Sequence, residues 1–124
     1  MTGNKLLDYL LDVGDDNSSI CELLELIKRD EDYVIDLCKD GGIPNLDELN
    51  ENTTLLVAKL CAILDYKIGL KRLPSWVCDK RLYYDNPIYV GRMDDFTRAK
   101  VFIFAPQAFL SRNIYFNIDG LKRF

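Results

Sequence analysis

The chain has 124 residues and contains no histidine. Serine and cysteine hydrolases of the usual kind take their general base from histidine, and most zinc hydrolases use histidine as a ligand. The usual forms of these chemistries are therefore excluded. Glycine-rich phosphate loops are also missing, because Gly41 and Gly42 precede a proline turn and no Lys-Ser or Lys-Thr pair follows them.

Cysteine is scarce and does not follow a metal-binding pattern. The four cysteines, Cys21, Cys38, Cys61 and Cys78, are too far apart in the sequence to form a CxxC pair. The first three lie among apolar residues at helical spacing, which favours buried free thiols in a reducing compartment. A metal site with four thiolate ligands and a secreted framework of two disulfides are the less favoured alternatives. We expect no metal and no cofactor.

Long hydrophobic runs are missing as well. No stretch approaches the roughly 18 apolar residues that span a membrane, and segment 5–12 carries too many charges for a secretory signal peptide. We therefore expect a cytoplasmic protein without a membrane partner. Hydrophobic residues make up 48% and charged residues 29% of the chain, proportions typical of globular proteins. The length fits a single domain over residues 1–124.

The charges divide the chain into an acidic helical half, 1–69, and a basic half that is rich in aromatic residues, 70–124. Residues 1–65 contain five Lys and Arg against fifteen Asp and Glu, a net charge of −10, whereas residues 66–124 have a net charge of +6. Twelve of the fourteen aromatic residues lie at or beyond Tyr66. We favour the interpretation that the two halves attract each other within one fold. The alternative is that each half meets a different partner.

Apolar residues recur at helical spacing through the first half. The last of the helices that they predict is apolar around more than half of its circumference, which indicates the central helix of the fold. The first expected helix runs over 5–13, and the second begins at Ser19, with Glu22 completing its cap. The third runs over 30–40, and a short turn opens at Asn45. The last runs from Thr53 or Thr54 to Ile68.

The second half contains shorter and more irregular segments. We expect a mainly α fold of about five helices with a small C-terminal β element, and an α+β fold is the alternative. The expected segments are an extended stretch over 73–77, a loop with at most a short strand over 81–84 and 87–90, and a β-strand over 101–104. They are followed by a short helix over 107–112 with Phe109 and Leu110 inward, a second strand over 114–116 and a final turn over 118–121.

Pairs of acidic residues do not indicate catalysis. Asp15-Asp16, the run 30–32 and Asp94-Asp95 each lie at an expected helix start or turn, where carboxylates cap backbone amides. None of them has the partners that paired acid–base chemistry needs. We therefore expect that the protein is not an enzyme and has no small-molecule substrate.

The basic half is also compatible with nucleic-acid binding, in which cations contact phosphates and aromatic rings stack on bases. However, a net charge of +6 over 59 residues is modest, and the chain has a pI near 4.8. The strongest helix pair, over 45–70, is acidic to neutral, unlike a recognition helix. The residues concerned are Lys80, Arg81, Arg92, Arg98, Lys100 and Arg112 for phosphates, and Tyr83, Tyr84 and Phe102 for bases.

Three motifs in the second half carry a resemblance. They are P-x-W-V at 74–77, Y-x-x-x-P at 83–87 and P-x-x-F-x-x-R-N-I at 106–114. The chain resembles a family of small bacterial proteins encoded beside predicted nucleotidyltransferases, in an arrangement like a toxin–antitoxin or abortive-infection module. It departs from the family pattern at 115–117. The resemblance implies a non-catalytic partner of an enzyme and carries over no catalytic residue.

We therefore predict a non-catalytic protein–protein interaction module, the antitoxin-like partner of a bacterial enzyme. It would bind a protein partner or a second copy through its basic half. A nucleic-acid-binding regulator is the alternative function. The candidate partner-binding residues are Trp76, Tyr83, Tyr84, Arg112 and Asn113. Two of them have a structural alternative: Trp76 as a core plug between the two halves, and Arg112 as a clamp on backbone carbonyls.

Overall fold

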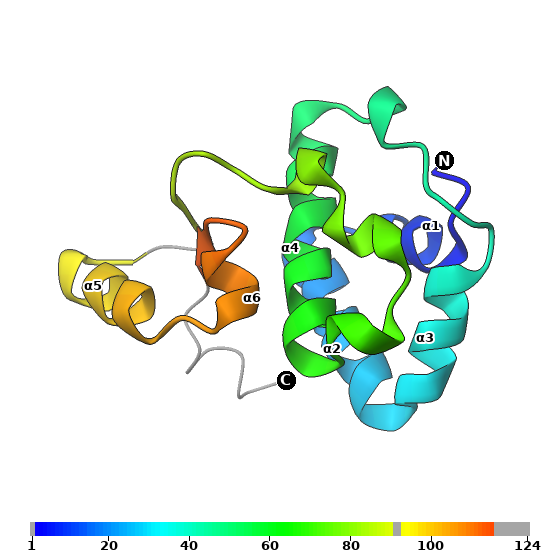
Figure 1. Ribbon diagram of the computed structural model, residues 1–124, viewed down its shortest axis with the longest axis horizontal. Helices are drawn as coiled ribbons and strands as arrows, with labels where there is room; N and C mark the ends of the chain where they lie inside the picture. The colour runs from blue at the N-terminus through cyan, green and yellow to red at the C-terminus, as the bar shows by residue number, and fades with distance from the viewer. Residues whose placement is uncertain (1, 91–92, 116–124) are drawn as a thin grey trace.

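The computed structural model describes residues 2–90 and 93–115, apart from the side chain of Phe104. It confirms a mainly α fold with a small β element in the second half. The helices and strands of the described part are α1 (Lys5–Leu11), α2 (Asp16–Arg29), α3 (Glu31–Lys39), α4 (Glu51–Lys67), β1 (Ile88–Tyr89), α5 (Asp95–Phe104), α6 (Gln107–Leu110) and β2 (Ile114–Tyr115). Figure 1 shows α4 in the middle, with α1 and α3 on one side of it and α5 and α6 on the other.

Helix α4 is the central helix, as its composition predicts. Its residues 56–58 and 60–64 are buried, so apolar side chains cover more than one face of the helix. Helix α2 packs against α4, and α6 and two of the 3₁₀ helices also contact α4. Each of these contacts removes apolar surface from water at about 25 cal/mol per Å², which makes α4 the centre of the hydrophobic core.

The helix starts differ from the predicted ones by a few residues. Helix α2 begins after Asp15, whose carboxylate accepts the amide of Ser18, and not at Ser19. Helix α4 begins after Asn50, whose side chain accepts the amide of Thr53. Aspartate and asparagine cap at least as well as serine and threonine, so the earlier residue starts the helix in each case.

Ser19 has a different role from the predicted cap. Its hydroxyl lies inside α2 and donates to the carbonyl of Leu10 at 2.7 Å, which ties α2 to the end of α1. The side-chain amide of Asn4 connects α1 to the end of α3, because it donates to the carbonyls of Cys38 at 2.7 Å and Gly42 at 3.2 Å. Gly41 completes this junction: it has a φ of +87°, and a Cβ there would overlap the carbonyl of Gly3.

The described residues include four 3₁₀ helices, at Leu46–Glu48, Leu70–Arg72, Ser75–Cys78 and Lys80–Leu82. The first matches the predicted turn near Asn45, although the side chain of that asparagine makes no capping hydrogen bond. The prediction of an extended stretch over 73–77 was wrong, because Ser75–Cys78 form a 3₁₀ helix. The loop predicted over 81–84 begins only at Tyr83, after the 3₁₀ helix at Lys80–Leu82. Pro74 is extended, but the 3₁₀ helix that begins at the next residue buries Trp76 and Val77 in the core.

The prediction of a β-strand over 101–104 was also wrong, because these residues form the last turn of α5. Strand β2 pairs instead with β1, in parallel, with Ile88 opposite Ile114 and Tyr89 opposite Tyr115. Two residues per strand give no alternating pattern long enough to identify a strand from sequence. The other expectations for this region, on residue 116 and on a turn over 118–121, lie outside the described residues.

The short helix after Pro106 forms as predicted, with Phe109 fully buried, but Leu110 is partly exposed and not inward. A four-residue helix is only about one turn long, so adjacent residues point in different directions. Among the described helices, none has the length and apolar character needed to cross a membrane.

Candidate protein-interaction surface

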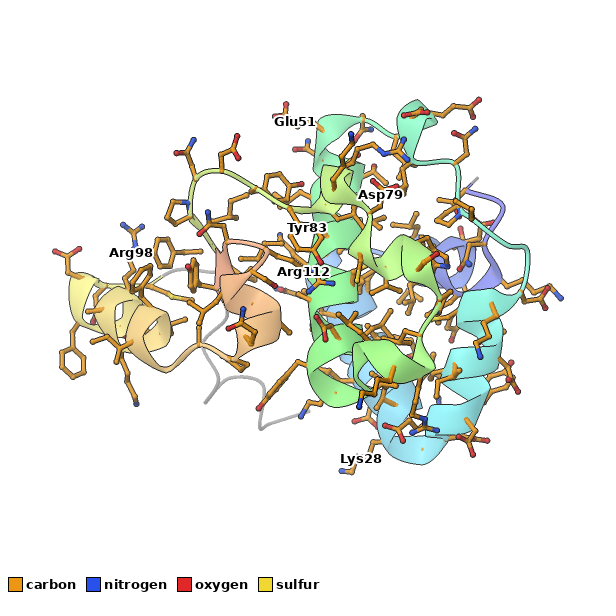
Figure 2. All side chains as sticks on the ribbon, viewed as in Figure 1. Lys28, Glu51, Asp79, Tyr83, Arg98 and Arg112 are labelled. Carbon is orange, nitrogen blue, oxygen red and sulfur yellow. The ribbon has the colours of Figure 1, made fainter. Side chains whose placement is uncertain are left out.

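The guanidinium of Arg112 is fully buried between α4, α6 and the 3₁₀ helix at Ser75–Cys78. Its Nη1 donates to the carboxylate of Asp65 at 2.7 Å and to the carbonyl of Ala108 at 3.0 Å, and its Nη2 donates to the carbonyl of Val77 at 3.1 Å. The ring of Tyr83 covers the guanidinium, whose carbon lies 4.8 Å from the ring centre. Figure 2 shows Arg112 and Tyr83 side by side against α4. Arg112 therefore clamps backbone carbonyls.

Trp76 is buried at the other side of the same 3₁₀ helix, with 4% of its surface exposed. Its indole N–H donates to the carbonyl of Cys38 at 3.0 Å, at the end of α3. The side chain thus joins the basic half to the acidic half, which is the core-plug arrangement. A partner cannot reach Trp76 or Arg112 unless the fold opens.

Tyr83, Tyr84 and Asn113 are half-buried around the start of β1 and β2. Asn113 has a φ of +60°, a conformation that asparagine adopts more readily than most residues. Its side-chain amide donates to the carbonyls of Tyr84 at 2.9 Å and Asp85 at 3.1 Å. These contacts close the loop before β1. Burial raises the pKa of both tyrosines, so neither is poised to act as a phenolate.

The five residues selected from the sequence therefore lie in and around a joint that holds the end of the described chain on α4. The P-x-W-V and R-N-I motifs supply its main contacts. Their unusual composition reflects a buried guanidinium and a left-handed turn.

Three arginines of the basic half, Arg72, Arg81 and Arg112, pair with carboxylates of the acidic half. Arg72 bridges α3 through Glu31 at 2.8 Å and Asp32 at 2.6 Å. Arg81 contacts both Asp47 and Asp79. Its side chain lowers the pKa of Asp79 to about 2, because the hydrogen bonds favour the charged carboxylate. These pairs support the interpretation that the two halves attract each other within one fold.

Several of the residues proposed for nucleic-acid contact bind other groups of the chain. Arg81 and Arg112 are bound to carboxylates, and Tyr83 lies against Arg112. Arg98 lies over the ring of Tyr89, 5.1 Å from its centre. Arg92 is outside the described residues.

Helix α5 carries the feature that the sequence reasoning missed. Three apolar residues are exposed on its outward side, where Lys100 also lies: Phe96 is 78% exposed, Ile103 is 70% exposed, and Ala99 between them is exposed too. The spacing i, i+3, i+7 places these three residues on one side of the helix. We call them the α5 face. The helix is also set apart from the main body, beyond α6 (Figure 1).

The inward side of α5 is anchored by fewer residues. Val101 is buried, and the ring of Phe102 lies 5.4 Å from that of Tyr115 on β2. The carboxylate of Asp94 accepts the amide of Thr97 and caps the helix. Because α5 is short and its apolar residues lie on both sides, the segment 101–104 resembles a strand when viewed in isolation. The signal that identifies the helix is Asp94-Asp95 followed by the spaced Phe96, Ala99 and Ile103.

A second apolar feature lies among α1, α2 and α3. It is an open groove of about 380 Å³, lined by Lys5, Tyr9, Leu26, Tyr33 and Leu37. Tyr9 and Tyr33 are each about half exposed at its edges. The hydroxyl of Tyr9 donates to Glu22 at 2.9 Å, and Lys5 pairs with Asp40 at 3.1 Å. We call this the three-helix groove.

The cysteines are all free thiols. Cys38 and Cys61 are buried as predicted, Cys21 is half-buried, and Cys78 is exposed. Burial raises the pKa of Cys38 to about 12, so its thiolate is negligible at neutral pH. In the described part of the chain, no group of three or more His, Cys, Asp or Glu side chains could hold a metal ion.

Comparison of the chain with protein-family models, with curated proteins and with solved structures finds no match in any of the three.

Proposed function

We propose that the protein is a non-catalytic protein–protein interaction module that docks through the α5 face. The observation that carries the proposal is the exposure of Phe96 and Ile103 on one side of a helix that stands apart from the core. Single exposed apolar residues are common on monomers, whereas a large aromatic and an aliphatic residue aligned on one helix side favour a binding role.

The arrangement suits helix-in-groove recognition. In that mode an amphipathic helix inserts anchors at i, i+3 and i+7 into an apolar groove of its partner. Phe96 and Ile103 have this spacing, and the small Ala99 between them permits close approach. Burial of each large side chain would contribute about 2 kcal/mol.

The helix is already formed and anchored in the unbound chain. The cap at Asp94, the buried Val101 and the ring contact between Phe102 and Tyr115 hold it in place. An anchored helix loses less conformational entropy on binding than a segment that must fold first, so the contact is more favourable.

The resemblance described above suggests which partner to expect. On this basis we propose that the protein is a cytoplasmic, antitoxin-like protein of a bacterium. Its partner would be an enzyme encoded beside this chain. The α5 face would then mask or scaffold that enzyme. This identity rests on the motifs at 74–114, whereas the docking surface rests on α5.

The proposal is tested by capture from the organism that encodes the chain, with three forms of the protein as bait. These are the wild type, a double variant with Phe96→Glu and Ile103→Glu, and Ile43→Glu. Ile43 is 74% exposed on the loop after α3 and is a matched control for a charge placed on an exposed apolar position. Lysates are treated with nuclease, and the eluates are compared by mass spectrometry at low and moderate salt.

The proposal predicts a stoichiometric protein that the wild type and Ile43→Glu retain and the double variant loses. Recovery of the same protein by the double variant would contradict it. Recovery of nuclease-sensitive material alone, with an affinity that falls steeply as salt rises, would contradict the proposal. It would indicate nucleic-acid binding instead.

A further inference from the structure

We infer that two stacked tyrosine rings on the β pair position α5 for docking. The rings belong to Tyr89 on β1 and Tyr115 on β2, and we call them the tyrosine platform. This inference rests on the proposed function of the α5 face and names the residues that hold that face in place. Neither tyrosine lies on the α5 face, so both are positioning residues and not contact residues.

The pairing of the strands brings the two rings together. Tyr89 lies directly opposite Tyr115 in the parallel pair. Paired side chains of neighbouring strands point to the same face of a sheet. The ring centres are 5.4 Å apart with 29° between the planes, a stacked arrangement within the favourable range for aromatic pairs. The amide of Ile88 donates to the carbonyl of Asn113 at 2.8 Å. The amide of Val90 donates to the carbonyl of Tyr115, also at 2.8 Å, so the register is fixed on both sides of Tyr89.

Tyr115 is the fixed member of the platform. Its side chain is buried, and its hydroxyl donates to the side-chain oxygen of Asn113 at 3.2 Å. The amide of the same asparagine donates to the carbonyls of Tyr84 and Asp85, in the joint that lies on α4. The platform is therefore attached to the core of the fold.

Helix α5 contacts the platform at two points one turn apart. The guanidinium carbon of Arg98 lies 5.1 Å from the ring centre of Tyr89, within the range of a cation–π contact. The ring centre of Phe102 lies 5.4 Å from that of Tyr115, with 34° between the planes. Residues four apart lie on the same side of a helix, and this side is roughly opposite to the α5 face. The two contacts therefore fix the rotation of α5 about its axis.

These aromatic contacts supply an orientation that the burial of Val101 does not. Burial of an apolar side chain is favourable but non-directional, so a helix can roll around it. Stacked rings and cation–π pairs depend on the direction from which the groups approach. The platform thus sets the direction in which Phe96 and Ile103 project, and a helix fixed in advance loses less entropy on binding.

The test compares three variants with the wild type by hydrogen–deuterium exchange of the full chain. Tyr89→Leu keeps an apolar side chain but removes the ring, whereas Tyr89→Phe keeps the ring and removes only the hydroxyl. Tyr66→Leu is the matched control. The ring of Tyr66 lies 5.3 Å from that of Phe109 and 5.2 Å from the ammonium of Lys67, but it belongs to α4 and not to the platform.

The inference predicts that the backbone amides of α5 exchange about tenfold faster in Tyr89→Leu, because a cation–π contact and a ring stack are both lost. They should keep their wild-type rates in Tyr89→Phe and in Tyr66→Leu. Unchanged exchange of α5 in Tyr89→Leu, or the same acceleration in Tyr89→Phe, overturns the inference. Equal acceleration of α5 and α2 in Tyr89→Leu also overturns it, since Tyr89 would then support the whole fold.

A second measurement connects the platform to docking and separates the two proposals. The capture described for the proposed function is repeated with Tyr89→Leu and Tyr89→Phe. Tyr89→Leu should recover less of the captured protein, because only molecules with α5 in place can bind. Equal recovery by both variants, while the double variant at Phe96 and Ile103 recovers none, overturns the inference and leaves the proposed function intact. If recovery does not depend on Phe96 and Ile103, the proposed function fails, whereas a selective acceleration of α5 still supports the platform.

Discussion

The buried guanidinium of Arg112 replaces its hydration shell with three fixed acceptors and one aromatic ring. Asp65 supplies the opposite charge, and the carbonyls of Ala108 and Val77 accept two further hydrogen bonds. Its Nε has no hydrogen-bond partner in the described part of the chain. A buried charge without such partners would be strongly unfavourable, so Arg112 and its acceptors depend on each other.

Replacement of Arg112 by leucine should therefore lower the free energy of unfolding by about 3 kcal/mol, because Asp65 and two carbonyls lose their donor. Urea unfolding measures this change. Arg29→Leu is the matched control: its guanidinium is mostly exposed, its ion pair with Glu22 spans 3.6 Å, and its loss should cost less than about 1 kcal/mol. Equal effects of the two substitutions would contradict the clamp.

The ionisation of Asp79 makes the stability of the fold depend on pH. Its pKa is held at about 2 by Arg81, below the ordinary value of 3.8, so the folded state favours the carboxylate. The resulting stability is fully present above about pH 4 and is lost as the pH falls through the folded pKa. Asp79→Asn should lower the stability at neutral pH by about 1 kcal/mol, since solvent screens the pair.

Urea unfolding of wild type and Asp79→Asn at several pH values measures this contribution. The difference between the two proteins should shrink toward zero between about pH 4 and pH 2. A difference that is constant over that range would show that Asp79 acts by something other than its charge.

The sequence was sufficient to single out the residues of the joint, but it did not show whether they face the core or a partner. Trp76, Arg112 and Asn113 stand out because their motifs are unusual. Whether such a residue faces a partner or the core depends on where Cys38, Asp65 and Val77 lie in space, and these are distant in the sequence. The structural alternatives considered for Trp76 and Arg112 describe the contacts that they make.

At the scale of elements, α5 depends on its cap more than the other described helices do. It packs against the rest of the described chain mainly through Val101 and Phe102, whereas α4 is surrounded by other elements. A helix of ten residues is marginal in water without such support.

Removal of the cap by Asp94→Ala should therefore loosen α5 locally. Backbone amides of α5 should exchange with deuterium about five times faster, because the amide of Thr97 loses its acceptor. Amides of α4 should keep their rates. Uniform acceleration over both helices would contradict a local role for this cap.

The longer helices could be predicted from the sequence because their apolar spacing extends over several turns. Their starts were less certain, since several capping residues occur near each start, as with Asp15 and Ser19. The pairing of β1 with β2 could not be predicted, because a strand of two residues has too few positions to show an alternating pattern. The contact of Asn113 with Tyr84 brings the two strands together. Helix α5 was missed because it has apolar residues on its outward side, contrary to the pattern of a surface helix.

At the scale of the whole molecule, the opposite charges of the two halves have two consequences. Arg72, Arg81 and Arg112 bind the basic half onto the acidic half. The remaining charge is still unequally distributed, with a strongly acidic three-helix end and the α5 face at the other end. The asymmetry thus favours the packing of the two halves against each other.

Site-specific photocrosslinking from position 99 in living cells tests the central claim most directly. Ala99 lies in the middle of the α5 face, and a photoreactive residue at exposed Ile43 serves as the control. The account predicts a discrete protein adduct from position 99 that disappears when Ile103→Glu is added and does not form from position 43. Adducts with nucleic acid alone, or the same protein adduct from both positions, would contradict the claim that the α5 face is a protein-docking surface.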